Sequence, residues 1–456
     1  MIQNNIIDKE QIQNNKLFYK VWSNIVLFRN IYRYVRLYKK NEKVLFKSRK
    51  QLLEYPEREF INCLIYTSCE NLEFGDLPIK CVLKEVELTM SNHSSIHGSL
   101  IPFGVETLKF PWVDNNRGIE TTQISTFPSS LKNLYGIFLG KNIYKTKIKS
   151  TKNKKQKING EKKEKRFIIP PNIESVFLNH STNISGEDKG EGYIVLLKGL
   201  KEITFDYCWY NQNIILRKGD FPDGLTTLAM HGYEIKNILN KDILPSSIKN
   251  LSISYGISEF DDNESESEPG TFDVLPPNIE KLKITNYCKI KQDSLLYKCS
   301  TLKNLSIFCG EIDSIIEPGS LPPNLTKLSI GCYKHQIKIG IIPFGVKTLK
   351  LQLTSDAQSG YNSNTIEIGS IPSSVESLSL NNYIAQPELF PPSLTHLTYT
   401  HFNYNDVSSD YSRDELFSFF SLLPNSITSL SLHKTREDLN FKFPNTIKKI
   451  DYEATK

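Results

Sequence analysis

The stretch Ile371-Pro372-Ser373-Ser374-Val375-Glu376-Ser377-Leu378-Ser379-Leu380 decides the fold of this chain. Its pattern, apolar-Pro-x-x-apolar-x-x-apolar-x-apolar, returns as a ten-residue motif throughout the sequence. Further copies begin at Ile101, Phe127 (a weaker one), Ile169, Phe221, Leu244, Leu275, Leu321, Ile342, Phe390, Leu423 and Phe443. Three reduced copies lack the proline but keep the apolar triplet, at Leu83/Val86/Leu88, Leu200/Ile203/Phe205 and Leu302/Leu305/Ile307. Fifteen copies of one motif predict a repeat array, in which each unit packs mainly on its neighbours.

The spacing and alternation of the motif predict its shape. Most steps from one apolar triplet to the next measure 19 to 27 residues, the range of leucine-rich-repeat-type coils. Within a copy, Leu-x-Leu alternates with the period of a strand, so that Leu378 and Leu380 point inward while Ser377 and Ser379 point outward. We therefore predict a β-dominated α/β repeat solenoid, a leucine-rich-repeat-like curved coil. Its parallel concave sheet should hold about fifteen short strands, with a small helical N-terminal cap.

The longer steps between copies coincide with insertions, which a coil tolerates because closure entropy grows slowly with loop length. We expect a basic disordered insert at residues 141–166 and an acidic loop at residues 259–270. Residues 414–423 are predicted to form a short helix in a longer loop, whereas long helices are not expected elsewhere on the coil. The resulting organisation is a disordered N-terminus (1–15), a helical leader (16–60) and the solenoid (61–456).

The leader follows a different periodicity from the rest of the chain. Within residues 16–48, apolar residues recur near helical spacing with arginine and lysine between them: Leu17, Val21, Trp22, Ile25, Phe28, Tyr32 and Val35. We predict one or two amphipathic helices whose apolar stripe covers the first coil, because the end of a repeat array otherwise exposes its core. Binding to a membrane surface is a second use for such a basic amphipathic stretch.

Composition and charge restrict the class of protein. The apolar content of 39% and charged content of 23% are typical of a folded soluble chain, and no apolar run is long enough to span a bilayer. A polar N-terminus and eight scattered cysteines favour a reducing, cytoplasmic location. The net charge of +6 comes from residues 141–166, which carry a local excess of ten positive charges. That run would support nuclear import or salt-sensitive, non-specific contact with nucleic acid, but no specific nucleic-acid binding.

No arrangement of residues predicts an active site. P-loop, Gly-x-Ser-x-Gly and His-Glu-x-x-His signatures do not occur in the sequence. His93 and His97 lie four residues apart, but in a loop-like composition without a third ligand nearby. Cys309 and Cys332 occupy equivalent places in consecutive coils, and we interpret them as small residues at tight turns. We therefore expect no catalysis, no cofactor and no metal.

The alternation also predicts which side chains face outward on the concave sheet. They are Thr227, Ala229, His231, Asn250, Ser252, Ser254, Lys281, Lys283, Thr285, Lys327, Ser329, Thr348, Lys350, Ser377, Ser379, His396, Thr398, Ser429 and Ser431. A solvated sheet face is the simpler explanation of a row of serine, threonine and lysine, since some residue must occupy each outward position. The functional interpretation is that Lys281, Lys283, Lys327 and Lys350, with His396 beyond them, form a positive patch for an acidic protein partner.

The motif resembles the FNIP repeat, a unit of about twenty-two residues related to leucine-rich repeats. Residues 371–390 match most fully, and Gln386-Pro387 lies where that family carries Asn-Gln-Pro. The leader around Phe18-Tyr19-Lys20-Val21-Trp22 is also similar to that of such proteins. The sequence departs from the family at the name-giving Phe-Asn, of which Phe402-Asn403 is the nearest trace.

The resemblance implies a non-catalytic scaffold that binds another protein through its concave sheet and flanking loops. Some relatives carry an F-box ahead of the repeats. This implies an alternative function, a substrate receptor of a ubiquitin ligase, in which Trp22, Ile25 and Phe28 would bind the adaptor. The leader lacks the Leu-Pro that opens an F-box.

Overall fold

In the computed structural model the chain forms two compact units. Unit 1 comprises residues 1–182 and 190–197, and unit 2 comprises residues 183–189 and 198–456. The described residues are 20, 23–68, 70–79, 82–89, 98–110, 127–137, 166–178, 193–196, 198–208, 218–232, 243–255, 275–285, 289–290, 296–309, 315–353, 366–381, 383, 385–400, 413–433 and 442–453.

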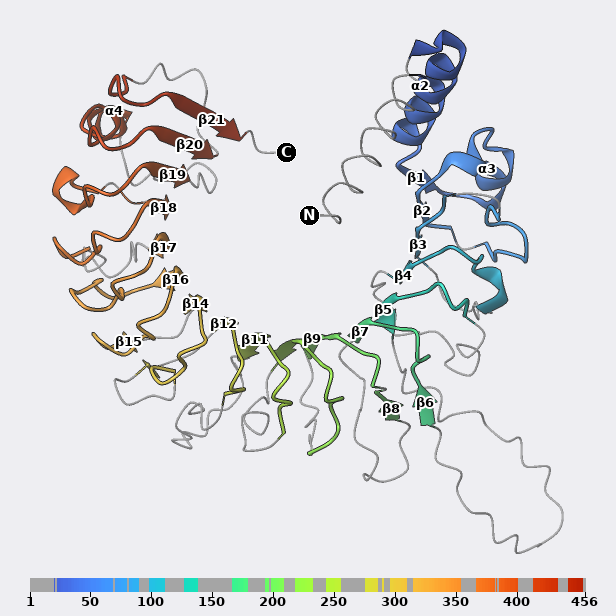
Figure 1. Ribbon diagram of the computed structural model, residues 1–456, viewed down its shortest axis with the longest axis horizontal. Coiled ribbons are helices and arrows are strands. Elements are labelled where there is room, and N and C mark those ends of the chain that lie inside the picture. Colours follow the sequence, from blue (N-terminus) through green and yellow to red (C-terminus); the bar gives the residue numbers. More distant parts are fainter. Residues whose placement is uncertain are drawn as a thin grey trace, which may run out of the picture. The chain divides into compact units, whose positions relative to one another are not determined.

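Unit 2 is built on eleven strands that pair in parallel, each with the next along the chain (Figure 1). They are β9 (Glu202–Cys208), β10 (Thr227–Gly232), β11 (Asn250–Tyr255), β12 (Lys281–Thr285), β14 (Asn304–Phe308), β16 (Lys327–Tyr333), β17 (Thr348–Leu353), β18 (Ser377–Asn381), β19 (His396–Thr400), β20 (Ser429–His433) and β21 (Lys449–Glu453). Within this unit the strands line the inner side of the bend made by the coils, which makes their outward face concave.

Unit 1 contains a second ladder of six parallel strands. They are β1 (Lys43–Phe46), β2 (Cys63–Tyr66), β3 (Glu85–Leu88), β4 (Thr107–Lys109), β5 (Asn133–Ile137) and β7 (Ser175–Leu178). Every one of the fifteen motif copies supplies a ladder strand, so the predicted parallel solenoid is confirmed. Two ladder strands were not predicted, β1 and β2, because neither follows a motif copy.

Short parallel pairs lie outside the two main ladders. In unit 1, β6 (Arg166–Ile168) pairs with β8 (Tyr193–Val195). In unit 2, β13 (Lys289–Ile290) pairs with β15 (Ile315–Ile316), and an isolated bridge joins Ile337 to Ile366. Elements of two or three residues carry no readable period, which is why the sequence did not predict them.

The core of each coil is filled by the apolar positions of the motif. In the copy that defines the pattern, Val375, Leu378 and Leu380 are fully buried, while Ser377 and Ser379 between the two leucines remain partly accessible. The register aligns equivalent leucines across the ladder, so that Leu349, Leu378 and Leu397 pack side by side. Each coil therefore covers the apolar edge of the next, as expected for a repeat array.

The motif's proline begins a tight turn that leads into each strand. The Pro372 carbonyl accepts a hydrogen bond from the Val375 N–H at 3.1 Å, and equivalent bonds recur from copy to copy. The residue just before the apolar triplet, such as Ser374 before Val375, then forms a side-chain hydrogen bond to the main chain of the preceding coil. Such bonds run from Ser130, Ser247, Asn278, Thr301, Asn324, Ser374 and Ser393. This position therefore joins neighbouring coils, which explains its preference for serine and asparagine.

Replacing Ser374 with alanine should reduce the free energy of unfolding by about 1–2 kcal/mol. The Ser374 hydroxyl donates to the Val346 carbonyl at 2.9 Å and accepts from the Gly345 N–H at 3.1 Å, so its loss leaves two main-chain groups without partners. Ser373→Ala is the matched control, because Ser373 is exposed and should change stability by less than about 0.5 kcal/mol. Urea denaturation of both variants checks the prediction, and equal midpoints would contradict it.

Helices are few and short among the described residues. Helix α2 (Ile25–Lys40) begins at Asn24, whose side chain accepts from the N–H groups of Val26 and Leu27. Helix α4 (Arg413–Ser421) confirms the helix predicted between β19 and β20. The remaining helical elements are α3 (Arg49–Glu54) and the 3-10 turns η1 (Arg58–Phe60), η2 (Gly98–Leu100) and η6 (Pro387–Leu389). Long helices on the outer side of the coils are absent from the described part, as predicted.

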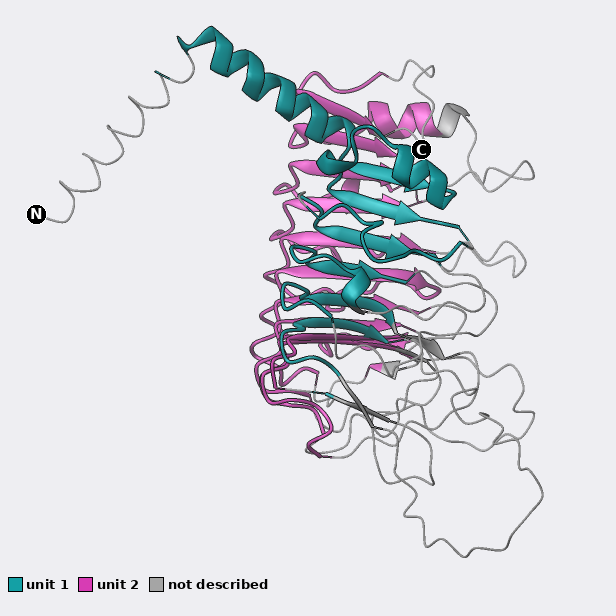
Figure 2. Ribbon diagram, turned by 90° about the vertical axis from the view of Figure 1, so that its right-hand side faces the viewer, with its two compact units in different colours: residues 1–182, 190–197 teal, residues 183–189, 198–456 magenta. Residues whose placement is uncertain are grey.

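The prediction that the leader's apolar stripe covers the first coil is wrong for α2. None of its residues is buried, and Figure 2 shows it running away from the strands of unit 1. The first strand is covered instead by α3 and the turn after it, where Leu52 is fully buried and Phe46 packs edge-on against Tyr55 at 5.4 Å between ring centroids. The sequence pattern identified an amphipathic helix but could not show which surface it contacts.

Candidate interaction surface on unit 2

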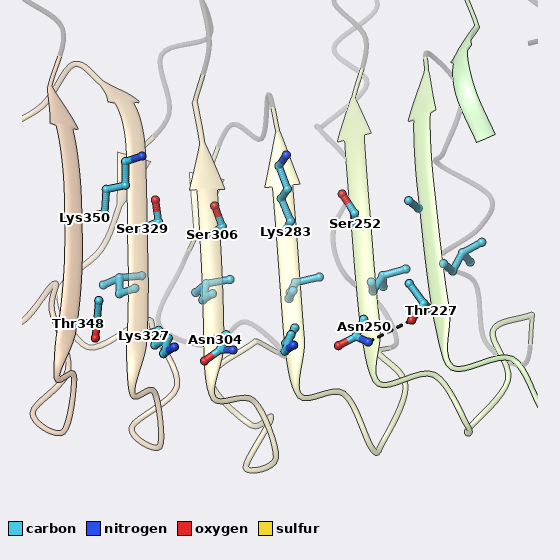
Figure 3. Close-up of a pocket in the computed structure, with 17 residues that line it drawn as sticks. Thr227, Asn250, Ser252, Lys283, Asn304, Ser306, Lys327, Ser329, Thr348 and Lys350 are labelled. Carbon is cyan, nitrogen blue, oxygen red and sulfur yellow. Dashed lines mark hydrogen bonds between the residues drawn. The ribbon is translucent and has the colours of Figure 1, made fainter. Parts of the chain in front are cut away.

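The outward side chains of unit 2 form two rows across the ladder, because adjacent parallel strands are in register. The first row runs Thr227, Asn250, Lys281, Asn304, Lys327 and Thr348. The second runs Ala229, Ser252, Lys283, Ser306, Ser329 and Lys350. Both rows line one groove with a volume of about 380 Å³, which we call the β10–β17 groove (Figure 3).

Four of the predicted partner-binding residues meet in this groove. Lys281 and Lys283 come from β12, Lys327 comes from β16 and Lys350 from β17, and all four side chains are exposed. One strand separates Lys281 from Lys327, which places their backbones about 10 Å apart at the usual strand spacing. The fifth predicted residue, His396, is exposed on the same side two strands beyond β17 but does not line the groove.

The charge of the groove is positive and uncompensated. Neither outward row contains aspartate or glutamate from β10 to β20. Glu280 and Glu376, just ahead of their strands, pair with Lys249 and Lys347 at 3.1 Å each. Within the described residues, no carboxylate lies within ion-pair distance of the four groove lysines. The groove can therefore attract an anionic group without first breaking an ion pair.

Sequence reasoning missed two groove residues and mispredicted the exposure of Ser254, which lies outside the groove. Asn304 and Ser306 lie on β14 between the lysines of β12 and β16 and were overlooked because the copy before them lacks proline. Ser254 was predicted to face outward but is buried. The side chain of His231 lies outside the described residues. Asn250 donates to the Thr227 hydroxyl at 3.0 Å, which links two neighbouring strands at the edge of the groove.

The residues proposed for adaptor binding are only partly described. Ile25 is exposed at the start of α2, and Phe28, one turn further along, is half-buried. Trp22 lies outside the described residues. The two described side chains fall on one side of α2, as helical spacing requires.

The thiols of Cys63, Cys299 and Cys332 form no disulfide, and burial favours their protonated form. Burial, aided by the nearby Glu85 carboxylate, raises the pKa of the Cys63 thiol to about 11. Burial likewise raises the pKa of Cys299 and Cys332 above the ordinary value. Because the thiolate is the nucleophile and the metal ligand, these thiols are poorly suited to either role near neutral pH.

The candidate metal-binding residues do not form a cluster in the described structure. Cys309 is buried, and Cys332 is half-buried with a φ of 52° at the irregularity between Gly331 and Tyr333. No group of three or more histidine, cysteine, aspartate or glutamate side chains that could hold a metal occurs among the described residues. His93 and His97 lie outside them. In the same part of the chain, no helix is both long and apolar enough to cross a membrane.

Comparison with known proteins gives a family match within unit 2. The family model described as FNIP Repeat matches residues 210–256, 313–353 and 361–400. These segments contain β10 and β11, β15 to β17, and β18 and β19. Several strands of the groove, including those that carry Lys327 and Lys350, therefore lie inside recognised repeats.

A solved structure similar to this chain is described as the crystal structure of CroV588, a novel circular LRR protein structure. The two chains are 19% identical, with a TM-score of 0.45, and the match covers 89% of this chain. This chain spans 58% of the length of that one. No curated protein matches the sequence.

Proposed function

We propose that this chain, which contains FNIP repeats in unit 2, is a non-catalytic scaffold that binds an acidic protein segment in the β10–β17 groove. The observation that supports this most strongly is the charge of the two outward rows, in which four exposed lysines form no ion pair with any carboxylate of the described residues. An extended segment lying across the strands could place an acidic side chain near each lysine. Asn304 and Ser306 between them would supply neutral hydrogen-bonding groups.

The form of the β10–β17 groove favours a protein segment over a small ligand. The groove extends over six strands, and its lining combines polar and lysine side chains with leucines of the strands along its whole length, which suits an elongated partner. Repeat arrays use such extended surfaces for protein binding. Exposed lysines contribute more to the rate and selectivity of association than to raw affinity, and their effect is reduced by salt. Binding should therefore weaken as ionic strength rises.

Replacing Lys281, Lys283, Lys327 and Lys350 together with serine should weaken binding of an acidic probe at least about tenfold. The probe is a fluorescein-labelled decaglutamate peptide, and its affinity is measured by fluorescence anisotropy at low and high salt. The matched control replaces Lys298, Lys338, Lys442 and Lys448, four exposed lysines of unit 2 outside the two rows, and changes net charge equally.

Comparison of the groove variant with the control variant distinguishes binding in the β10–β17 groove from general attraction of the acidic probe to a positively charged protein. We expect the control to retain affinity within about twofold and both variants to keep the melting temperature of the parent chain. Affinity purification with the same three proteins should then enrich acidic proteins that are lost only when the groove lysines are replaced. Equal loss in both variants, or no loss in either, would remove the groove from the proposed function.

A further inference from the structure

One side of α2 presents an apolar stripe to solvent. Ile25, Phe28, Tyr32 and Val35 recur at the spacing that places residues on one helix face. Ile25 is 62% exposed, Tyr32 54% and Val35 44%, while half-buried Phe28 stacks on Tyr32 at 6.1 Å between centroids. This exposure of large apolar side chains on a helix costs free energy in water unless another surface covers them.

A basic stripe runs beside the apolar one. Arg29, Arg33, Arg36 and Lys40 follow helical spacing, Lys39 adds a fifth cation, and α2 contains no aspartate or glutamate. Lys40 is paired with Glu57 at 2.9 Å, and the Arg36 guanidinium lies 5.6 Å from the centroid of the Tyr32 ring. Among the described residues, no carboxylate pairs with Arg29, Arg33 or Arg36. A partner for this face must therefore combine apolar surface with negative charge.

The attachment of α2 to unit 1 leaves both stripes accessible. Within the described part of unit 1, Tyr34 and Tyr38 in the C-terminal half of α2 pack on Phe60 at 5.9 and 5.5 Å between ring centroids. There the buried Asn41 side chain donates to the Leu37 carbonyl at 2.8 Å and to the Glu57 carboxylate at 3.0 Å. From this fixed end the helix extends away from the strands (Figure 2). The side chains that hold it are distinct from the apolar stripe.

We propose that α2 binds the surface of an anionic lipid membrane, lying in the interface with its apolar stripe among the acyl chains. Helices with a segregated apolar face, aromatic residues and a cationic polar face lie in this way. The arginines would reach lipid phosphates, and each cation near an anionic surface adds to affinity. A second copy of the chain fits less well, because pairing two such faces would gather arginines and lysines without a carboxylate between them.

Flotation of the full chain with lipid vesicles tests the proposal. The probes are vesicles of phosphatidylcholine alone and of phosphatidylcholine with 30% phosphatidylserine. We expect at least about tenfold stronger binding to the anionic vesicles. Replacing Arg29, Arg33 and Arg36 with glutamine should reduce that binding on the order of a hundredfold. Replacing Ile25 and Val35 with glutamine should reduce it at least about tenfold. Leu45→Gln, at an exposed apolar residue of β1, should leave binding unchanged.

Three results would overturn the proposal. Equal binding to both kinds of vesicle, or no binding to either, would exclude an anionic lipid surface as the partner. Binding that survives both α2 changes but disappears when residues 141–166 are deleted would assign it to that basic run. A parent chain that is dimeric, or that co-purifies with an adaptor protein, only while Ile25 and Val35 are intact would assign the stripe to a protein contact instead.

Discussion

Replacing Gly136 with alanine should destabilise unit 1 by at least about 3 kcal/mol. Gly136 lies in β5 with a φ of 80°, a conformation that side chains other than glycine adopt at a cost. An alanine Cβ would also clash with the main-chain oxygen of Phe110, a contact that only a shift of the backbone can relieve. The N–H of the same residue, Phe110, donates to the Tyr135 carbonyl at 2.9 Å. A shift of the Phe110 backbone would therefore disturb the pairing of β4 with β5.

The matched control for this change is Gly75→Ala. Gly75 has a similar φ of 91°, but no atom lies within 4 Å of the position an added Cβ would take. The control therefore measures the conformational cost alone, about 1–2 kcal/mol. Hydrogen exchange across β4 and β5, together with urea denaturation, measures both variants. If the two changes prove equally costly, the close approach of β5 to Phe110 is not present in the folded chain.

Replacing Phe420 with alanine should lower the free energy of unfolding by about 3–5 kcal/mol and loosen the C-terminal end of unit 2. Phe420 is fully buried on α4 and lies 5.5 Å from Tyr399, 5.1 Å from Phe419 and 5.6 Å from Phe443 between ring centroids. The longest connection between consecutive ladder strands of unit 2 runs from β19 to β20 and contains α4. The aromatic cluster around Phe420 holds this connection against Tyr399 of β19 and Phe443 of the last motif copy.

Leu422→Ala is the control for the aromatic cluster, because Leu422 follows α4 but is 57% exposed. It should change stability by less than about 0.5 kcal/mol. Hydrogen exchange should show faster opening of β19 to β21 in the Phe420 variant and unchanged rates at β12 to β16, because each coil contacts mainly its neighbours. Uniform acceleration along the whole ladder would contradict this local role.

The ladder could be predicted from the sequence because one local pattern encodes both the turn and the strand. In residues 371–380 the proline begins the turn, Ser374 bonds to the previous coil, and Leu378 and Leu380 fill the core. The same alternation assigned Lys281 and Lys327 to the outward face. Copies that keep only the triplet still formed strands, as Leu302, Leu305 and Ile307 do around β14.

The features that were missed depend on contacts that no local pattern contains. Strands β1 and β2 join the ladder without a motif copy, through pairing between residues about twenty apart. Helix α2 was recognised as amphipathic, but its position depends on Asn41, Glu57 and Phe60 holding its end, which periodicity does not reveal. Ser254 shows the same limit, because it continues the outward register of β11 and is nevertheless buried.

Site-specific photo-crosslinking tests most directly whether the β10–β17 groove receives the partner. A benzoylphenylalanine placed at Ser306 would stand in the groove between the lysines of β12 and β16, whereas one placed at Ser373 would stand on an exposed turn. With a partner recovered by affinity purification, we predict a crosslinked adduct from Ser306 and none from Ser373. Crosslinking from Ser373 alone would contradict the account.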